Sequence, residues 1–151
     1  MDMREIMQST GLCKGLDDNH IDALIKLLKV IEYPPNAIII PEDNHSRDLY
    51  VIASGKVSVI ANVPFEEGQV EIAESLRVGQ VFGDVAFVDG YPRSATVKTQ
   101  IKTTVFQITY EPLVELMNRE AQFGYIFMSN IANLLASKIR NTTLALRNLM
   151  L

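Results

Sequence analysis

The sequence predicts a mainly β domain with helices at both ends. Three observations support this fold class. First, short β-type runs with turn residues between them fill residues 37–109. Second, the flanking segments have helical spacing. Third, the 151 residues are 48% hydrophobic and 21% charged, which is typical of one globular domain. We divide that domain into an N-terminal helical part (1–33), a β part (34–109) and C-terminal helices (110–151). Strands this short and numerous form a sandwich, a barrel or a roll.

A helix is predicted near the N-terminus. Asp17 has the residue type and position of an N-cap. One apolar stripe follows at helical spacing and consists of Ile21, Leu24, Ile25 and Leu28. Pro34 and Pro35 cannot continue a helix, so we expect a turn there.

Six strands are predicted in the β part. They cover residues 37–40, 48–53, 56–61, 69–76, 94–100 and 103–109. Apolar and polar residues alternate in the third and fourth of these strands, as in half-buried antiparallel strands. Between these two strands, Glu66 and Glu67 are interpreted as part of a polar hairpin loop rather than as an acid/base pair.

Two helices are predicted after Thr109. Pro112 suits the first turn of a short helix, whose apolar residues are Leu113, Val114, Leu116 and Met117. A longer helix runs from about residue 119 to 149 and would be about 45 Å long. Its apolar positions alternate four- and three-residue steps, at Met128, Ala132, Leu135, Ile139, Thr142, Leu146 and Leu149. A helix of this length exceeds what a small β domain can cover, so we expect a homodimer through residues 119–150.

Charge and cysteine content limit the possible partners. The net charge is −4 with no basic run, which gives no indication of nucleic-acid binding. No secretory signal or membrane-spanning stretch is visible. Cys13 is the single cysteine, so no intramolecular disulfide can form. We therefore expect a cytoplasmic protein with neither nucleic acid nor membrane as a partner.

No catalytic or metal-binding constellation is visible. His20 and His45 are expected to face solvent, since neither has a second ligand at metal spacing. Two isolated histidines also cannot supply the metal site of a cupin, another β-roll family. There is no Gly-x-Ser-x-Gly motif, and Cys13 has no assigned base. The sequence therefore predicts a protein that is not an enzyme and has no cofactor or metal.

Residues 79–97 carry the features of an anion site. Gly83 allows the backbone to approach a ligand closely because it has no Cβ atom. The next three residues can form one helical turn whose free N–H groups would face an anion. Arg93, after Gly90 and Pro92, supplies a planar cation suited to two phosphate oxygens.

This segment resembles the phosphate-binding cassette of cyclic-nucleotide-binding domains, as in the catabolite activator protein and the regulatory subunits of protein kinase A. The family pattern is Phe-Gly-Glu-(apolar)-Ala, a short run, then Arg-(small)-Ala-(x)-Val. The matching residues are Phe82, Gly83, Ala86, Arg93, Ser94, Ala95 and Val97. Residues 49–57 also resemble the family's strand–glycine–strand hairpin. The resemblance covers nearly the whole chain and implies a β-roll (a double-stranded β-helix of the jelly-roll type), with N-terminal helices, a short C-terminal helix and a long dimerisation helix.

The resemblance implies a ligand site, with a cyclic mononucleotide, cyclic AMP slightly favoured over cyclic GMP, as the ligand. The backbone of Gly83, Val85 and Ala86 would hold the phosphate together with the Arg93 guanidinium. Ser94 would lie near the phosphate or the purine edge.

The other site residues implied by the resemblance would contact the sugar and the base. Asp84 would bind the ribose, at the position where the family has glutamate. Residues 136–143 resemble the stretch that covers the base in activator-type members. Thr142 and Thr143 would face the base, with Lys138 one turn earlier.

Two function classes follow. The first is a regulatory module that senses a cyclic nucleotide and signals through its C-terminal helix to an unidentified effector protein. The family's DNA-binding, kinase or channel part is not among these residues, so the module is expected to act in trans or to be a fragment. The alternative is a dimeric interaction or scaffold protein of the same fold that binds no nucleotide. Asp84, one methylene shorter than the family's glutamate, favours this alternative, and the intact Arg93 argues against it.

Overall fold

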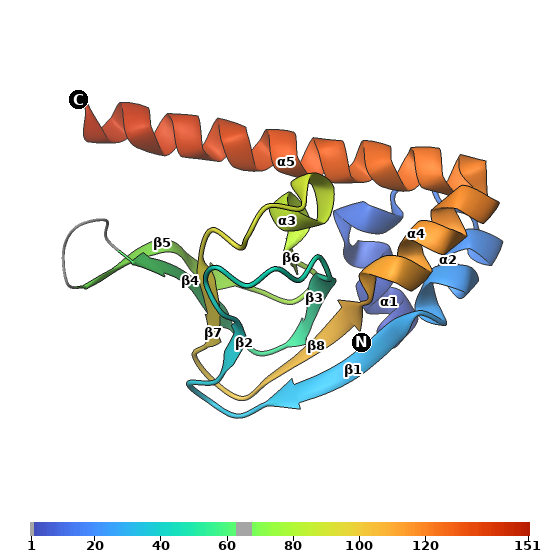
Figure 1. Ribbon diagram of the computed structural model, residues 1–151, viewed down its shortest axis with the longest axis horizontal. Helices are drawn as coiled ribbons and strands as arrows, with labels where there is room; N and C mark the ends of the chain where they lie inside the picture. Colours follow the sequence, from blue (N-terminus) through green and yellow to red (C-terminus); the bar gives the residue numbers. More distant parts are fainter. Residues whose placement is uncertain (1, 63–67) are drawn as a thin grey trace.

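Two four-stranded antiparallel sheets form the centre of the fold in a computed structural model that describes residues 2–62 and 68–151. The first sheet has the strand order β1 (Leu28–Tyr33), β8 (Thr103–Ile108), β3 (Leu49–Ser54) and β6 (Val81–Phe82). The second has the order β2 (Ile38–Ile40), β7 (Thr96–Thr99), β4 (Val57–Asn62) and β5 (Gln69–Leu76). Chain neighbours such as β2 and β3 lie in different sheets, and the chain therefore winds as a β-roll (Figure 1).

Helices lie against one side of this roll. The N-terminal ones are α1 (Met3–Ser9), the 3₁₀ helix η1 (Gly11–Cys13) and α2 (Asp18–Ile25). The others are α3 (Asp84–Asp89), α4 (Tyr110–Arg119) and α5 (Ala121–Leu149). In Figure 1, α5 runs along the whole side of the molecule, with α3 between it and the roll and α1, α2 and α4 grouped around its first half. Within the described ranges, no helix has the length and apolar character needed to cross a membrane.

The buried side chains form two clusters. The first lies between the helices and the first sheet, and α5 contributes Phe123, Phe127 and Ile131 to it. The second fills the inside of the roll, where the Tyr50 and Phe82 rings stack with centroids 5.0 Å apart. The first sheet therefore contributes to both clusters, and α3 adds Phe87 to the first.

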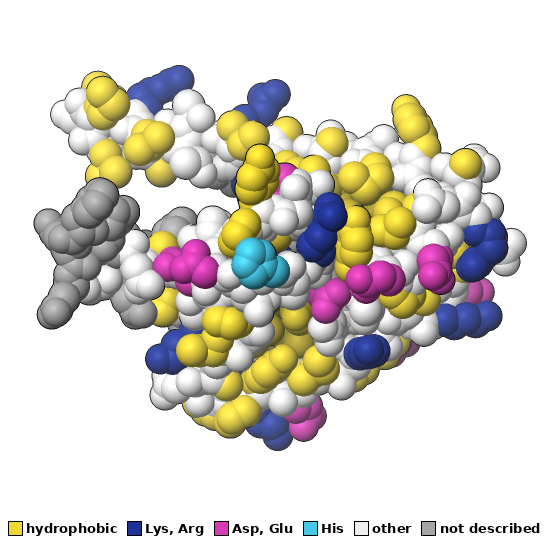
Figure 2. All heavy atoms as spheres, viewed as in Figure 1, with side chains coloured by type: hydrophobic (Ala, Val, Ile, Leu, Met, Phe, Trp, Pro, Cys, Tyr) yellow, Lys and Arg dark blue, Asp and Glu magenta, His cyan; other side chains and the backbone are white. Residues whose placement is uncertain are grey.

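The first half of α5 is anchored to the N-terminal helices. The buried Asn130 side-chain amide donates hydrogen bonds to the carbonyl oxygens of Leu12 (2.7 Å) and Lys14 (2.8 Å). At Gly11, a Cβ atom would lie 2.9 Å from Leu134 Cδ2, so η1 and α5 approach closely. From Ile139 onward every residue of α5 is exposed, and this distal part of the helix stands clear of the roll (Figure 2).

The predicted β part is present. Each of the six predicted strands forms, with ends shifted by two residues at most. The two C-terminal helices also form, beginning at Tyr110 and Ala121. Asp17 caps α2 as predicted, since its carboxylate accepts a hydrogen bond from the His20 amide at 2.8 Å. The hairpin loop predicted at Glu66 and Glu67 lies outside the described residues.

The N-terminal prediction is wrong at Leu28. The helical stripe ends at Ile25, and Leu28 begins β1, which pairs with β8 along its whole length from Leu28–Ile108 to Tyr33–Thr103. Pairing with a central strand therefore outweighs the helical spacing. Like β1, three further elements were not predicted: η1, β6, which is two residues long, and α1, whose capping box of Asp2 and Glu5 is a readable signal.

The prediction that both histidines face solvent is wrong for His20. Only 14% of its side chain is exposed, and its ring lies against Phe123 with centroids 5.7 Å apart. His45 is exposed, as predicted.

Candidate functional site

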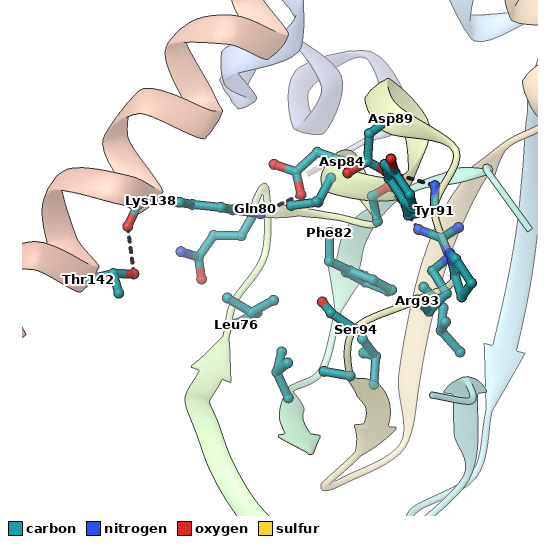
Figure 3. A pocket seen from close by; sticks show the side chains of 18 of the residues that line it. Leu76, Gln80, Phe82, Asp84, Asp89, Tyr91, Arg93, Ser94, Lys138 and Thr142 are labelled. Carbon is teal, nitrogen blue, oxygen red and sulfur yellow. Dashed lines mark hydrogen bonds and ion pairs between the residues drawn. The ribbon is translucent and has the colours of Figure 1, made fainter. Parts of the chain in front are cut away.

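A cavity of about 610 Å³ opens between the roll, α3 and α5 (Figures 2 and 3). Its floor is apolar and comes from five strands, at Ile40, Val59, Leu76, Phe82 and Val97. Its rim has polar and charged groups from α3, from the turn after it and from one face of α5. An apolar floor with polar groups on one side is typical of a site for an amphiphilic small molecule.

The Arg93 guanidinium is fixed in the wall of this cavity. Its side chain comes from the segment before β7, and only 4% of the residue is exposed. Nη1 donates to the Gly83 carbonyl at 2.8 Å, and Nη2 donates to the Asp48 carbonyl at 2.8 Å and to Ser46 Oγ at 3.3 Å. Nε is buried and has no hydrogen-bond partner in the described ranges of the chain.

Burial also changes the electrostatics of Arg93. It lowers the pKa of the guanidinium, and nearby Tyr50, Asp48 and Asp84 act in the opposite direction. Arginine nevertheless stays charged near neutral pH. Its hydrogen-bond partners are neutral groups that the fold holds in place. Among the described residues, the cavity wall therefore contains a preorganised cation whose Nε donor is unused. Such a group can bind an anion by charge-assisted hydrogen bonds.

Gly83 makes this arrangement possible. It caps α3 with φ of +85°, in the left-handed region. A Cβ atom there would lie 2.7 Å from the Asp48 carbonyl oxygen and 2.9 Å from Arg93 Nη1. Glycine is therefore needed for the backbone conformation and for the close approach of the guanidinium.

Asp84 and Lys138 form an ion pair at the edge of the cavity (Figure 3). Lys138 Nζ lies 2.6 Å from Asp84 Oδ1 and donates to the Val81 carbonyl at 3.3 Å. The Asp84 side chain is 3% exposed, and its Oδ2 atom is buried without a hydrogen-bond partner in the part of the chain described. One carboxylate oxygen thus holds α5, while the other can accept a hydrogen bond from a ligand.

Asp48 connects the arginine site to α4. Its backbone carbonyl accepts from Arg93, while its Oδ1 atom accepts from the Tyr110 amide at 2.8 Å. Its Oδ2 atom accepts from Gln107 Nε2, also at 2.8 Å. Tyr110 is the first residue of α4, so one residue links the cavity wall and the start of the C-terminal helices.

The fold brings together eight of the nine residues assigned from the sequence. The eight that line the cavity are Gly83, Asp84, Val85, Ala86, Arg93, Ser94, Lys138 and Thr142. Thr143 does not line it, and its hydroxyl donates back to the Ile139 carbonyl at 2.9 Å. The Lys138 ammonium group is paired with the Asp84 carboxylate, although the resemblance assigns Lys138 to the purine base of the ligand.

Several lining residues were not predicted, including Gln80, Asp89, Tyr91, Asn141 and Ala145. For α5 the signal was present in the sequence. Positions 138, 141, 142 and 145 are spaced as one helical face, and these are the four residues of α5 that line the cavity. The resemblance assigns Thr143 by position, and that assignment stays a prediction; the helical spacing adds Asn141.

Comparisons with known proteins agree with this geometry. Residues 30–120 match the family described as "Cyclic nucleotide-binding domain". The chain is similar to the potassium channel KAT1 of Oryza sativa subsp. japonica, with 25% identity over 126 residues, which is 83% of this chain and 17% of the channel. The chain therefore spans less than a fifth of that relative's length.

Solved structures share the fold. The catabolite activator protein of Thermus thermophilus is 26% identical with a TM-score of 0.79, and the match covers 93% of this chain and 63% of that one. A cyclic nucleotide-binding domain from Methylobacillus flagellatus is 23% identical with a TM-score of 0.81, covering 91% and 78%. The family match spans more than half of the chain, from β1 to the end of α4, and includes α3 and Arg93. The chain therefore belongs to the cyclic nucleotide-binding domain family.

Proposed function

We propose that the chain is a sensor that binds a cyclic mononucleotide, with cyclic AMP favoured over cyclic GMP, and signals through α5. The observation that carries the proposal is the buried Arg93 guanidinium, whose Nε has no hydrogen-bond partner in the described ranges and which lies in the wall of the cavity. Burying a cation is costly unless an anion compensates for the lost hydration. A ligand phosphate is the anion that this family membership suggests.

The cavity offers a place for each part of the nucleotide. The phosphate would contact Arg93, the backbone of the first turn of α3, and Ser94. The ribose hydroxyl would donate to the free Oδ2 atom of Asp84. The base would face α5, where the Thr142 hydroxyl donates its proton to the Lys138 carbonyl and keeps its oxygen available as an acceptor. The adenine amino group is a donor at this edge, whereas guanine carries a carbonyl oxygen, and this difference supports cyclic AMP.

The output of the sensor would be a change in α5. This helix contacts the ligand cavity through four residues and then continues as an exposed apolar stripe. Ile139 is 66% exposed, Leu146 56% and Leu149 83%, which supports a homodimer formed through residues 119–150. We infer a regulatory role in the cytoplasm rather than catalysis, with a separate effector protein that reads the position of α5. A ligand can shift that position only through its different affinity for the two states.

A nucleotide-free dimeric scaffold remains the second candidate. One observation favours it: the Asp84 carboxylate, which would bind the ribose, is already paired with Lys138. A protein that uses this pair only to fix α5 would need no nucleotide.

Isothermal titration calorimetry with cyclic AMP and cyclic GMP tests the proposal. The wild type is compared with Arg93→Ala and Arg93→Lys, and Arg119→Ala serves as a matched control on the exposed end of α4. We expect Arg93→Ala to weaken binding by about 30-fold to several thousand-fold, which is about 2–5 kcal/mol. Arg93→Lys keeps the charge but not the fork of donors, so it should lose a smaller part of the affinity.

The fold of each variant is checked by circular dichroism. Absence of heat with either nucleotide from the folded wild type would reject the sensor and favour the scaffold. Equal affinities for the wild type and Arg93→Ala would reject Arg93 as the phosphate ligand.

A further inference from the structure

Arg47 does not line the ligand cavity, but it contacts both α3, which lines the cavity, and Tyr110 of α4. The residue is in the loop before β3, and its Nη2 atom donates to the carbonyl oxygens of Phe87 (2.9 Å) and Val88 (3.2 Å). These carbonyls are in the last turn of α3, where carbonyl groups have no intrahelical donors. Arg47 therefore caps the end of α3 from outside the cavity.

The same guanidinium stacks on the ring of Tyr110. Its Cζ atom lies 4.3 Å from the ring centroid, which is within the range of a cation–π interaction. The Tyr110 ring also meets Phe87 edge-on at 5.6 Å, and Phe87 meets Phe127 of α5 at 6.4 Å. Tyr110 begins α4, so Arg47 joins the end of α3 to the start of the C-terminal helices.

The local backbone leaves room for this contact. At Gly90, the residue that follows α3, a Cβ atom would lie 3.2 Å from both Cζ and Nη1 of Arg47. Gly90 has φ of +70° and its amide closes α3 by donating to the Ala86 carbonyl at 2.9 Å. Because Gly90 has no side chain, the Arg47 guanidinium fits between the end of α3 and the Tyr110 ring. A lysine ammonium could approach the ring, but it lacks the planar fork that spans two carbonyls and a ring face together.

We propose that Arg47 is a positioning residue that transmits movement of α3 to α4 when the cavity is occupied. The inference rests on the proposed function, because a ligand at Gly83 and Arg93 would act on the first turn of α3, and Arg47 holds its last turn. With the guanidinium in place, α3 and Tyr110 are held together by hydrogen bonds and ring stacking; without it, only the edge contact between Phe87 and Tyr110 joins them directly, so more of the movement of α3 stays local. Such coupling means that α3, Arg47 and the start of α4 have two joint arrangements, and that the ligand changes the free-energy difference between them.

Amide hydrogen exchange, followed by NMR with and without saturating cyclic AMP, tests this role. The proteins are the wild type, Arg47→Met, Arg47→Lys and the control Arg119→Met. In all four, cyclic AMP should slow exchange in α3 (84–89). In the wild type and Arg119→Met it should also change exchange in the first turn of α4 (110–114). In Arg47→Met this second response should be much smaller than in the wild type, and in Arg47→Lys it should be intermediate.

The measured quantity is the change in amide exchange that cyclic AMP causes in each helix. A general loss of stability would affect both helices and would not remove the response of α4 alone. Should Arg47→Met fail to fold, Arg47→Lys supplies the comparison. A full α4 response in both Arg47 variants would overturn the inference while leaving the sensor intact. A wild type that responds in α3 but not in α4 would do the same. A wild type without any response in α3 would overturn both the sensor and the role of Arg47.

Discussion

Lys138 Nζ lies 2.6 Å from Asp84 Oδ1, although the two residues are 54 positions apart in the chain. The carboxylate is almost completely buried, whereas the Lys138 side chain is 43% exposed. Lysine supplies the charge that makes a buried carboxylate tolerable, and it does so from α5. The pair is therefore a direct electrostatic connection between α5 and the first turn of α3.

Removal of the lysine should destabilise the protein. Lys138→Met leaves the Asp84 charge buried without its partner, so we expect the free energy of unfolding to fall by about 1–3 kcal/mol, less than for a fully buried pair because the lysine is partly exposed. Asp84→Asn in the same chain should restore most of this loss. Urea denaturation of the wild type, both single variants and the double variant gives the coupling energy. A coupling energy near zero would show that the contact contributes nothing to stability.

Gly83→Ala should be more harmful than Gly15→Ala. The two glycines have similar positive φ angles, +85° and +80°, so both substitutions impose the same backbone strain of about 1–2 kcal/mol. At Gly15 the new Cβ would make an ordinary contact with Ile126 at 3.7 Å, whereas at Gly83 it would clash with the Asp48 carbonyl and Arg93. We expect Gly83→Ala to cost at least about 1 kcal/mol more in urea denaturation. Equal losses would contradict the close approach.

Tyr50 should make stability fall at high pH. Burial, with a smaller effect of the Asp48 charge, raises the pKa of Tyr50 to about 12. The unfolded chain has a tyrosine pKa of about 10. The contribution is complete below pH 10 and is lost as pH rises toward 12, because the unfolded state releases its proton first. Between pH 9 and 11.5 we expect a loss of up to about 2 kcal/mol in urea denaturation. Tyr50→Phe should remove this part, and Tyr125→Phe, at a 77% exposed position, should not.

Asn130→Asp should release the anchored half of α5. The amide nitrogen that now faces two carbonyl oxygens at 2.7 and 2.8 Å would be replaced by an oxygen, which cannot donate and carries charge. We expect a loss of about 2–4 kcal/mol in the free energy of unfolding. Asn133→Asp is a suitable control, since Asn133 is exposed on the same helix and should change stability by less than about 0.5 kcal/mol. A small effect at Asn130 would show that the apolar contacts of α5 suffice.

The exposed stripe of α5 should govern the oligomeric state. Ile139→Glu combined with Leu146→Glu places like charges in the proposed dimer seam, and sedimentation should then report the mass of one 16.9 kDa chain. Leu144→Glu is the matched control, because Leu144 is 50% exposed but lies outside the seam. A wild type that sediments as a monomer, or a double variant that stays dimeric, would contradict the seam.

The sequence predicts the roll well because the signals for its strands are local. Alternating residues and turn residues mark the strands, and all six predicted strands form. The failure at Leu28 has a non-local cause, since β1 exists through its pairing with β8, about 75 residues away. Helical spacing from Ile21 to Leu28 continues past the point where that pairing takes over.

The candidate site shows the same division. The residue types around Gly83 and Arg93 are recognisable in the sequence, but the burial of Arg93 depends on the Asp48 carbonyl, 45 positions away. Neither the Lys138 partner of Asp84 nor the stacking of Arg47 on Tyr110 has a local signal. Asn141 differs, because helical periodicity alone would have placed it beside Thr142 on the cavity face.

In the proposed sensor, the anchoring of α5 at Asn130 would let this helix act as a lever. From Asn130 to Leu149 the helix rises by about 28 Å, and from Asn130 to Lys138 by about 12 Å. A rigid rotation about Asn130 therefore multiplies any displacement at the Asp84–Lys138 pair more than twofold at the far end. Ten degrees of tilt would carry Leu149 about 5 Å sideways, close to the pitch of one helical turn. In the proposed dimer, a shift of ångström size beside the cavity would be enough to change which residues of α5 the partner helix meets.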